Sequence, residues 1–253
     1  MAFYLYGVVR SGCEVPADLT GVGPDDPPVG TFALDDELAA VVSELDGEAP
    51  MDGEAPLQGR DVLTHKRVLD EVFTECAVLP FRFGTISPDE EQLRSDLGAH
   101  AREYLETLQL LEDKVEVEVT ASYDEDAVLS EILTARPDLR ELSRSTQGAP
   151  EMQSLLQLGE VVADEVERWR ETELARLVDR LAPSASGYAE RAQRQDAALR
   201  AAFLVPRDAL PEFDNALGEL GRETEGRYEI ETVGPVPPYS FTGSDWSPSS
   251  TGD

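Results

Sequence analysis

The chain has 253 residues, of which 41% are hydrophobic, and its 52 acidic and 21 basic side chains give a formal net charge of −31. The hydrophobic fraction is sufficient for a folded core, which excludes a wholly disordered protein. The charge disfavours nucleic-acid and membrane-surface binding, because both need Lys and Arg to neutralise negative groups. One explanation of such acidity is that it maintains solubility or adapts the protein to high salt. The other is that acidic faces keep the protein dispersed while a small apolar surface binds an aggregation-prone partner. The sequence leaves these alternatives open.

The N-terminal part of the chain is predicted to begin with strands. Residues 2–10 form a buried strand rich in aromatic and branched side chains, and apolar runs over 31–34 and 38–45 predict two more strands. The segment 46–60 contains the pentapeptide DGEAP twice, which is too short for a solenoid and indicates an exposed acidic loop.

A helix is predicted from Asp61, because apolar residues then recur at helical spacing. Its apolar face and flanks comprise Val62, His65, Val68, Leu69, Val72, Phe73 and Cys76. A strand and turn follow over 77–85. The segment 87–90 predicts the start of a second helix, with Ser87 as the cap and Glu90 completing a capping box.

The second half of the chain predicts a sheet covered by helices. Residues 115–123 alternate apolar and polar side chains, which is typical of a half-buried strand. The elements expected after it are a short helix over 126–135, a loop ending at Pro150, a long helix over 151–181, a strand over 201–205, a helix over 208–220 and a strand over 228–233. This order suggests an α+β fold of ferredoxin-like type, although one strand of that fold is not visible in the sequence. A boundary near residue 112 separates two α+β halves.

The sequence carries no pattern for catalysis, cofactor binding or metal binding. The two histidines, His65 and His100, have no third ligand at a recognisable spacing, and helix N-termini and turns explain the clusters of carboxylates. Nucleophile and phosphate-binding signatures are missing. His65 is expected to be a core histidine and His100 to be solvated. We therefore expect no enzyme, no cofactor and no small-molecule substrate.

The cysteines and the N-terminus bear on the cellular compartment. Cys13 and Cys76 lie far apart and form no CxxC motif or Cys/His cluster, and Cys76 is expected to be a small buried hydrophobic residue. The N-terminus lacks the features of a signal peptide, and no run approaches the roughly 18 apolar residues of a membrane span. These observations predict a cytoplasmic protein.

The segment LPFRFGT, residues 79–85, is not explained by core packing alone. Pro80 suits an edge strand or a bulge, because it cannot donate to a sheet ladder. Arg82 is a lone cation between two aromatic residues. It either has a structural role, in which it snorkels or pairs with a carboxylate, or belongs to an interface.

The segment GPVPPYSF, residues 234–241, has three prolines in four positions and is predicted to be extended and polyproline-like. An extended chain places Tyr239 and Phe241 on one side, where they can dock in a groove. The segment lies either on its own protein or on a partner. We favour its own protein, because the segment directly follows a predicted strand.

These segments, taken in chain order, resemble the gas vesicle accessory proteins GvpF and GvpL. The resemblance spans residues 3–241 and rests on 3–8 (FYLYGV), 38–43 (LAAVVS), His65 followed by 78–85 (VLPFRFGT), and the segment 234–241. Val236 departs from the pattern, because the family often has Trp there. The resemblance therefore does not imply an aromatic anchor at that position.

The resemblance implies a fold and a role. The fold is an N-terminal α+β domain of unusual fold over 1–112, a C-terminal modified ferredoxin-like domain over 113–233, and an extended Pro-rich strap with a flexible tail over 234–253. The role is that of a minor protein of gas vesicle formation, which binds the hydrophobic shell protein GvpA and other vesicle proteins and limits aggregation during early assembly. The alternative is a structural component retained in the mature wall. The candidate interface or family-motif residues are Tyr6, Gly7, His65, Pro80, Arg82, Phe83, Gly84, Gly234, Pro235, Pro237, Pro238, Tyr239 and Phe241.

Overall fold

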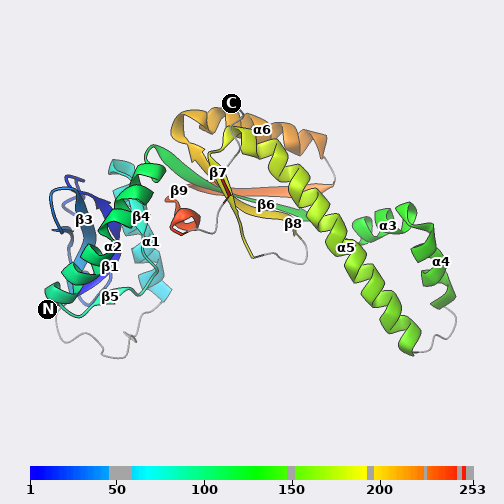
Figure 1. Cartoon of the computed structure of the whole chain (residues 1–253), viewed down its shortest axis with the longest axis horizontal. Helices are drawn as coiled ribbons and strands as arrows, with labels where there is room; N and C mark the ends of the chain where they lie inside the picture. The colour runs from blue at the N-terminus through cyan, green and yellow to red at the C-terminus, as the bar shows by residue number, and fades with distance from the viewer. Residues whose placement is uncertain (46–58, 147–151, 193–196, 225–226, 244–246, 249–253) are drawn as a thin grey trace. The chain divides into compact units, whose positions relative to one another are not determined.

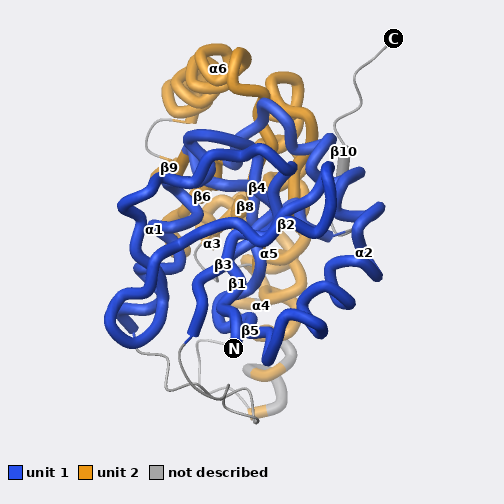
Figure 2. Tube along the Cα trace, turned by 90° about the vertical axis from the view of Figure 1, so that its left-hand side faces the viewer, with its two compact units in different colours: residues 1–116, 235–245 blue, residues 117–234, 246–253 orange. Residues whose placement is uncertain are grey.

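The computed structural model divides into two compact units. Unit 1 comprises Met1–Glu116 and Pro235–Asp245, and unit 2 comprises Val117–Gly234 and Trp246–Asp253 (Figure 2). The residues that the structure describes are 1–45, 59–146, 152–192, 197–224, 227–243 and 247–248. The predicted acidic loop falls largely on 46–58, outside the described residues, as does most of the predicted flexible tail.

Unit 1 contains a five-stranded antiparallel sheet with β1 at its centre. The strand order is β2-β3-β1-β4, and β5 also pairs with β1. The strands are β1 (Ala2–Arg10), β2 (Val29–Ala33), β3 (Leu38–Leu45), β4 (Val78–Pro80) and β5 (Ile86–Ser87). The predicted strands over 2–10 and 38–45 are confirmed, and the strand predicted over 31–34 begins two residues earlier.

Helices α1 (Gly59–Glu75) and α2 (Glu90–Leu111) lie on opposite faces of this sheet (Figure 2). Tyr4 of β1 contacts a side chain of α1, while its neighbour Phe3 packs on Phe32, over which Arg94 of α2 lies. Successive strand side chains point to opposite faces, so β1 is covered on both. Because both of its faces are covered, β1 has a nearly continuous apolar sequence and is buried at eight of its nine residues.

Two details of these helices differ from the prediction. Val62 is 47% exposed and does not belong to the buried face of α1. The cap of α2 is Asp89, whose side chain accepts a hydrogen bond from the backbone N–H of Gln92 at 2.8 Å. Ser87 cannot serve as the cap, because it lies in β5 and pairs with Phe3 of β1.

Cys13 and Cys76 form a disulfide, with their Cα atoms 6.0 Å apart and a separation of 63 positions in sequence. The prediction that Cys76 is a small buried hydrophobic residue is therefore wrong. The bond ties the loop after β1 to the residue that follows the end of α1. Since stable disulfides belong to oxidising conditions, the cysteines give no support to a reducing compartment.

Unit 2 is built on a second five-stranded sheet with the order β10-β7-β8-β6-β9. Its strands are β6 (Lys114–Tyr123), which starts in unit 1, β7 (Gly187–Glu190), β8 (Ala197–Pro206), β9 (Tyr228–Val236), which ends in unit 1, and β10 (Ser247–Pro248). Its helices are α3 (Glu125–Ala135), α4 (Pro137–Thr146), α5 (Met152–Leu181) and α6 (Leu210–Glu223). The succession β6-α5-β7-β8-α6-β9 is a β-α-β-β-α-β arrangement, with α3 and α4 inserted before α5.

Two helices of unit 2 pack on its sheet, and the other two pack on one of these helices. Helices α5 and α6 contact each other and both contact β8, while α3 and α4 lie beside the N-terminal part of α5 (Figure 1). The mixed α+β class is therefore confirmed. Helix α4 occupies a segment that was predicted to be a loop, and β7 is a four-residue strand with no counterpart in the prediction.

Candidate functional site

An aromatic cluster in unit 1 gathers residues from three of the motif segments. The rings of Tyr4 and Tyr6 from β1, His65 from α1 and Phe83 from the segment after β4 have centroids 4.9 to 6.4 Å apart. Tyr6 stacks on His65 with an angle of 29° between the ring planes. Sequence analysis had selected Tyr6, His65 and Phe83 and had missed Tyr4. The alternation of β1 could have revealed Tyr4, since residues two apart share a face.

Hydrogen bonds link His65 to Tyr4 and to the turn after β4. The backbone N–H of Gly84 donates to the hydroxyl oxygen of Tyr4 at 3.1 Å, and this oxygen lies 3.0 Å from Nδ1 of His65. The Tyr4 hydroxyl and Nδ1 of neutral His65 can each be the donor in this contact, because the hydroxyl oxygen has two lone pairs and the imidazole has two tautomers. Nε2 is buried and has no hydrogen-bond partner among the described residues.

Burial keeps this cluster uncharged. Desolvation lowers the pKa of His65 to about 4, although a backbone hydrogen bond with Phe81 acts to raise it. Desolvation also raises the pKa values of Tyr4 and Tyr6, although hydrogen bonds from Gly84 and from Ser43 and Val22 oppose the shifts. At neutral pH all three rings are therefore neutral, as expected for a core histidine. A buried neutral cluster of this kind acts as a rigid support rather than as a proton-transfer site.

Gly7 permits close contact between β1 and β4. Gly7 and Pro80 are register partners in the two strands, and the pairing of β1 with β3 shifts between Leu5 and Gly7. A Cβ atom added at Gly7 would lie 2.6 Å from the carbonyl oxygen of Leu79. Gly7 is therefore needed for strand packing. Pro80 is buried and ends β4, which is last in the strand order, so the predicted place in an edge strand is confirmed.

Arg82 is presented at the surface by a turn that follows β4. Its carbonyl oxygen accepts hydrogen bonds from the backbone N–H and the hydroxyl of Thr85, at 3.2 and 2.7 Å. Gly84 has a φ of 86°, in the region that favours glycine. The guanidinium of Arg82 is exposed and makes no hydrogen bond or ion pair with any described residue. The carboxylate partner considered from the sequence is therefore not found in this part of the chain.

The C-terminal segment Pro235–Phe241 packs against its own unit. Pro237, Pro238 and Phe241 are buried. Pro235 and Val236 end β9, and Tyr239–Phe241 forms a 3-10 turn, so the prediction of a wholly extended strap is wrong for its second half. The chain turns because the N–H of Phe241 bonds to the carbonyl of Pro238 at 3.2 Å. Gly234 precedes the segment in unit 2, with a φ of 153°.

The segment is held by a buried carboxylate. The backbone N–H and the hydroxyl of Ser240 donate to Glu116 at 2.7 and 2.8 Å. Glu116 is fully buried, although its place in an alternating strand predicted a half-exposed side chain. The hydroxyl of Tyr239 is also buried and has no described partner, and burial, with the charges of Asp70 and Glu116, raises its pKa.

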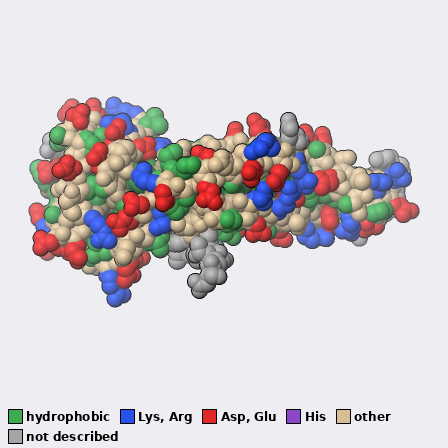
Figure 3. Space-filling view, turned by 90° about the horizontal axis from the view of Figure 1, so that it is seen from above, with side chains coloured by type: hydrophobic (Ala, Val, Ile, Leu, Met, Phe, Trp, Pro, Cys, Tyr) green, Lys and Arg blue, Asp and Glu red, His purple; other side chains and the backbone are tan. Residues whose placement is uncertain are grey.

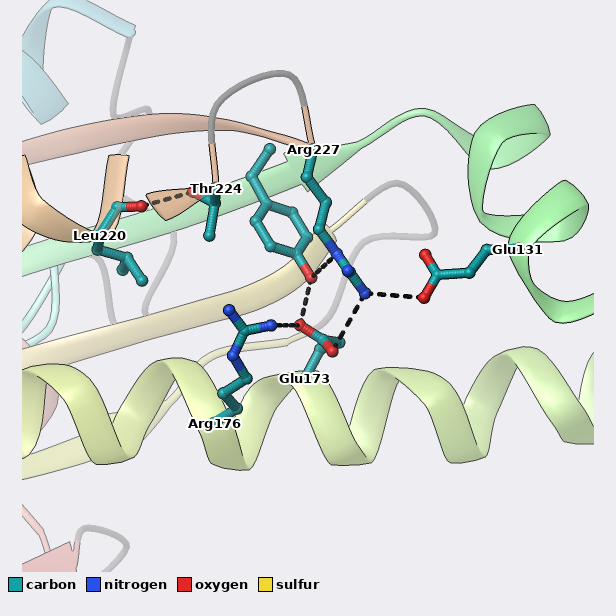
Figure 4. Close-up of polar contacts among 7 residues, drawn as sticks. Glu131, Glu173, Arg176, Leu220, Thr224 and Arg227 are labelled. Carbon is teal, nitrogen blue, oxygen red and sulfur yellow. Dashed lines mark hydrogen bonds and ion pairs between the residues drawn. The ribbon is translucent and has the colours of Figure 1, made fainter. Parts of the chain in front are cut away.

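A second polar network, in unit 2, surrounds Glu173 of α5 (Figure 4). Its carboxylate accepts hydrogen bonds from the Tyr228 hydroxyl at 2.5 Å, from Arg227 at 3.3 Å and from Arg176 at 3.2 Å. Arg227 also pairs with Glu131 of α3 and lies over the ring of Trp169. The network joins α3, α5 and β9. No sequence pattern predicts this network, because acidic and basic residues are common throughout these helices.

Two surface hollows have volumes of about 510 and 210 Å³. The larger lies along β2 and β3, and the smaller lies between α3 and α5. Neither is lined by His65 or Arg82. Within the described ranges, no group of three or more His, Cys, Asp or Glu side chains could hold a metal ion, and no helix is long and apolar enough to cross a bilayer.

Comparison with known proteins identifies the family. Residues 2–243 match the family model described as gas vesicle synthesis protein GvpL/GvpF. The chain is 35% identical over 244 residues to gas vesicle protein F of Streptomyces sp. (strain CB03234), covering 95% of this chain and 99% of that protein. It is 25% identical over 247 residues to gas vesicle protein F of Dolichospermum flosaquae, covering 96% of this chain and 98% of that protein.

Two solved structures have the same fold. The crystal structure of GvpF from Anabaena sp. PCC7120 superposes with a TM-score of 0.80 at 23% identity, covering 96% of this chain and 98% of that one. The crystal structure of GvpF from Microcystis aeruginosa superposes with a TM-score of 0.76 at 22% identity, covering 96% of this chain and 99% of that one. The family match over nearly all residues, supported by a relative above 30% identity, shows that the chain belongs to the GvpL/GvpF family of gas vesicle synthesis proteins.

Proposed function

We propose that this protein is an accessory protein of gas vesicle formation that binds the hydrophobic shell protein GvpA and other vesicle proteins. In this role it limits aggregation of GvpA and supports early assembly. The observation that carries the proposal is membership of a gas vesicle synthesis family over residues 2–243. We also propose that the two units correspond to an N-terminal α+β domain and a C-terminal ferredoxin-like domain, and that the motif residues of unit 1 support an interface.

The surface suits such a role. A gas-tight wall needs shell subunits with large apolar surfaces, which aggregate when they are unpaired. On the face drawn in Figure 3, hydrophobic side chains occur in small patches among acidic and basic ones. A net charge of −31 keeps the protein itself dispersed while it holds an aggregating subunit. We propose no catalytic activity.

Co-purification tests the proposal. The full chain is co-expressed with tagged GvpA, and an unrelated acidic protein of similar net charge serves as the control. We expect enrichment of the chain over the control, and slower sedimentation of GvpA when the chain is present. Equal recovery of the chain and of the control would count against the proposal.

The second candidate function is that of a permanent minor component of the vesicle wall, which the family name also accommodates. Washing purified vesicles with urea or salt and probing for this chain separates the two roles. Retention after washing favours the structural role, and complete loss favours the transient accessory role.

A further inference from the structure

Most basic side chains in the part of the chain that the structure describes have a partner, and Arg82 does not. In the described ranges, the basic side chains without a hydrogen bond, ion pair or ring contact are Arg10, Arg82 and Arg144. The chain has 52 carboxylate residues for 21 cations, so an exposed arginine has many potential partners. An unpaired arginine in such surroundings has its guanidinium available to another molecule.

The turn that carries Arg82 is rigid. The two hydrogen bonds from Thr85 hold the carbonyl of Arg82, and the N–H of Gly84 is held by the hydroxyl of buried Tyr4. The ring of Phe83 packs edge-on against His65 at 5.7 Å. A partner that binds this turn therefore finds the backbone already ordered and loses little further entropy.

Arg82 also has aromatic neighbours with accessible area. Phe81 packs on Tyr104 of α2 at 5.8 Å, and both Phe81 and Phe83 are only half-buried. An exposed arginine whose two sequence neighbours are partly exposed aromatic residues has the composition of an interface hot spot. The guanidinium supplies a planar pair of donors that matches a carboxylate, and the rings supply apolar contact beside it.

We infer that the segment Phe81–Gly84, the Arg82 turn, docks a partner protein, and that Arg82 receives a carboxylate of that partner in a bidentate ion pair. The inference rests on the proposed function, in which the partner is a vesicle protein. The occupant follows from charge complementarity, because the turn offers one exposed guanidinium that has no partner among the described residues. The buried Tyr4–His65 cluster holds the turn in place and does not touch the partner.

Three variants of Arg82 and one matched control test the inference in the full chain. The control is Arg10→Ala, because Arg10 is likewise exposed, unpaired and in unit 1. With co-expressed tagged GvpA as the probe, we expect Arg82→Ala to weaken capture about fivefold and Arg82→Glu about twentyfold or more. Arg82→Lys keeps the charge but loses the bidentate geometry, so its capture lies between wild type and Arg82→Ala. All variants should unfold at the wild-type temperature, since Arg82 has no contact to lose.

The outcomes separate this inference from the proposed function. If wild-type protein captures no GvpA, the proposed function fails and the inference fails with it. If wild type captures GvpA and Arg82→Glu does so as well as Arg10→Ala, the function stands and the Arg82 turn is not the site. A partner variant with one carboxylate replaced by Lys is expected to restore capture by Arg82→Glu. If no single replacement restores it, the assignment of a carboxylate is wrong.

Discussion

Ser240 donates both its backbone N–H and its hydroxyl to the buried carboxylate of Glu116, 124 positions earlier in the chain. Hydrogen bonds to a charged group contribute about 1.5–3 kcal/mol, so this pair is a principal attachment of the C-terminal segment. Ser240→Ala removes one of the two bonds and should lower the free energy of unfolding by about 1–2 kcal/mol. Urea unfolding measures the change. Thr242→Ala is the control, since Thr242 is exposed and makes only a 3.4 Å contact with the carbonyl of Tyr239.

Removal of the Cys13–Cys76 disulfide should destabilise unit 1. A bond that closes a loop of 63 residues restricts the unfolded chain by about 4 kcal/mol in the chain-entropy estimate. We expect a dithiol reductant to lower the urea midpoint of wild type to that of the double variant Cys13→Ser/Cys76→Ser. The reductant should leave the double variant unchanged. Two titratable thiols in unreduced native protein would contradict the bond itself.

His65 should make stability depend on pH. Its pKa is about 4 when folded and about 6.5 when unfolded, so the unfolded chain binds the extra proton between these values. The contribution of neutral His65 is complete above pH 6.5 and is lost as pH falls towards 4, by up to about 3 kcal/mol. The free energy of unfolding should therefore fall less steeply over this range in His65→Gln than in wild type. The carboxylates contribute equally to the pH dependence of both proteins, so the difference between the two curves reports on His65. If the free energy of unfolding falls equally steeply in both, His65 is not buried in neutral form.

Gly7→Ala should disturb the pairing of β1 with β4. The added Cβ meets the carbonyl oxygen of Leu79, a backbone atom that cannot move without the strand. Overpacking of this kind costs about 1–3 kcal/mol. Gly30→Ala is a matched control in the same sheet, because a Cβ there has no atom within 4 Å. The unfolding temperature should drop clearly for Gly7→Ala only. Similar unfolding temperatures for the two variants would contradict the close approach of β1 to β4.

Glu173→Ala should destabilise unit 2 more than an exposed substitution on the same helix. The change leaves Arg227, Arg176 and the Tyr228 hydroxyl without their shared acceptor. Loss of one partner from a largely buried charged network costs about 3–5 kcal/mol. Glu171→Ala, two positions away and exposed, should change the unfolding free energy by less than about 0.5 kcal/mol. Equal effects would show that the network adds nothing to stability.

The parts of the fold that were predicted are those whose signal is local. β1, β3 and β6 bury most of their side chains, and the apolar runs of β1 and β3 and the alternation of β6 are visible in short windows. β7 was missed because four residues are too few for a pattern. The cap of α2 was misplaced by two residues, because the pairing of Ser87 with β1 overrides a good local capping sequence.

The parts of the site that could not be predicted depend on contacts between distant residues. The alternation of β6 predicts that Glu116 faces solvent, whereas Ser240, 124 positions later, donates hydrogen bonds that favour its burial. The disulfide joins two cysteines that share no motif. Tyr6, His65 and Phe83 were each selected from their own motif, but neither their association in one cluster nor the hydrogen bonds through Tyr4 was predicted.

The chain leaves unit 1 after Glu116 and returns to it at Pro235. During synthesis, the ribosome must therefore translate Val117–Gly234, the larger part of unit 2, before the last piece of unit 1 is available. Until Phe241 emerges from the exit tunnel, the carboxylate of Glu116 lacks Ser240 and the site for the Phe241 ring stays open. A nascent or prematurely terminated chain is consequently incomplete in its N-terminal unit, even though every residue of that unit up to Glu116 has long been made.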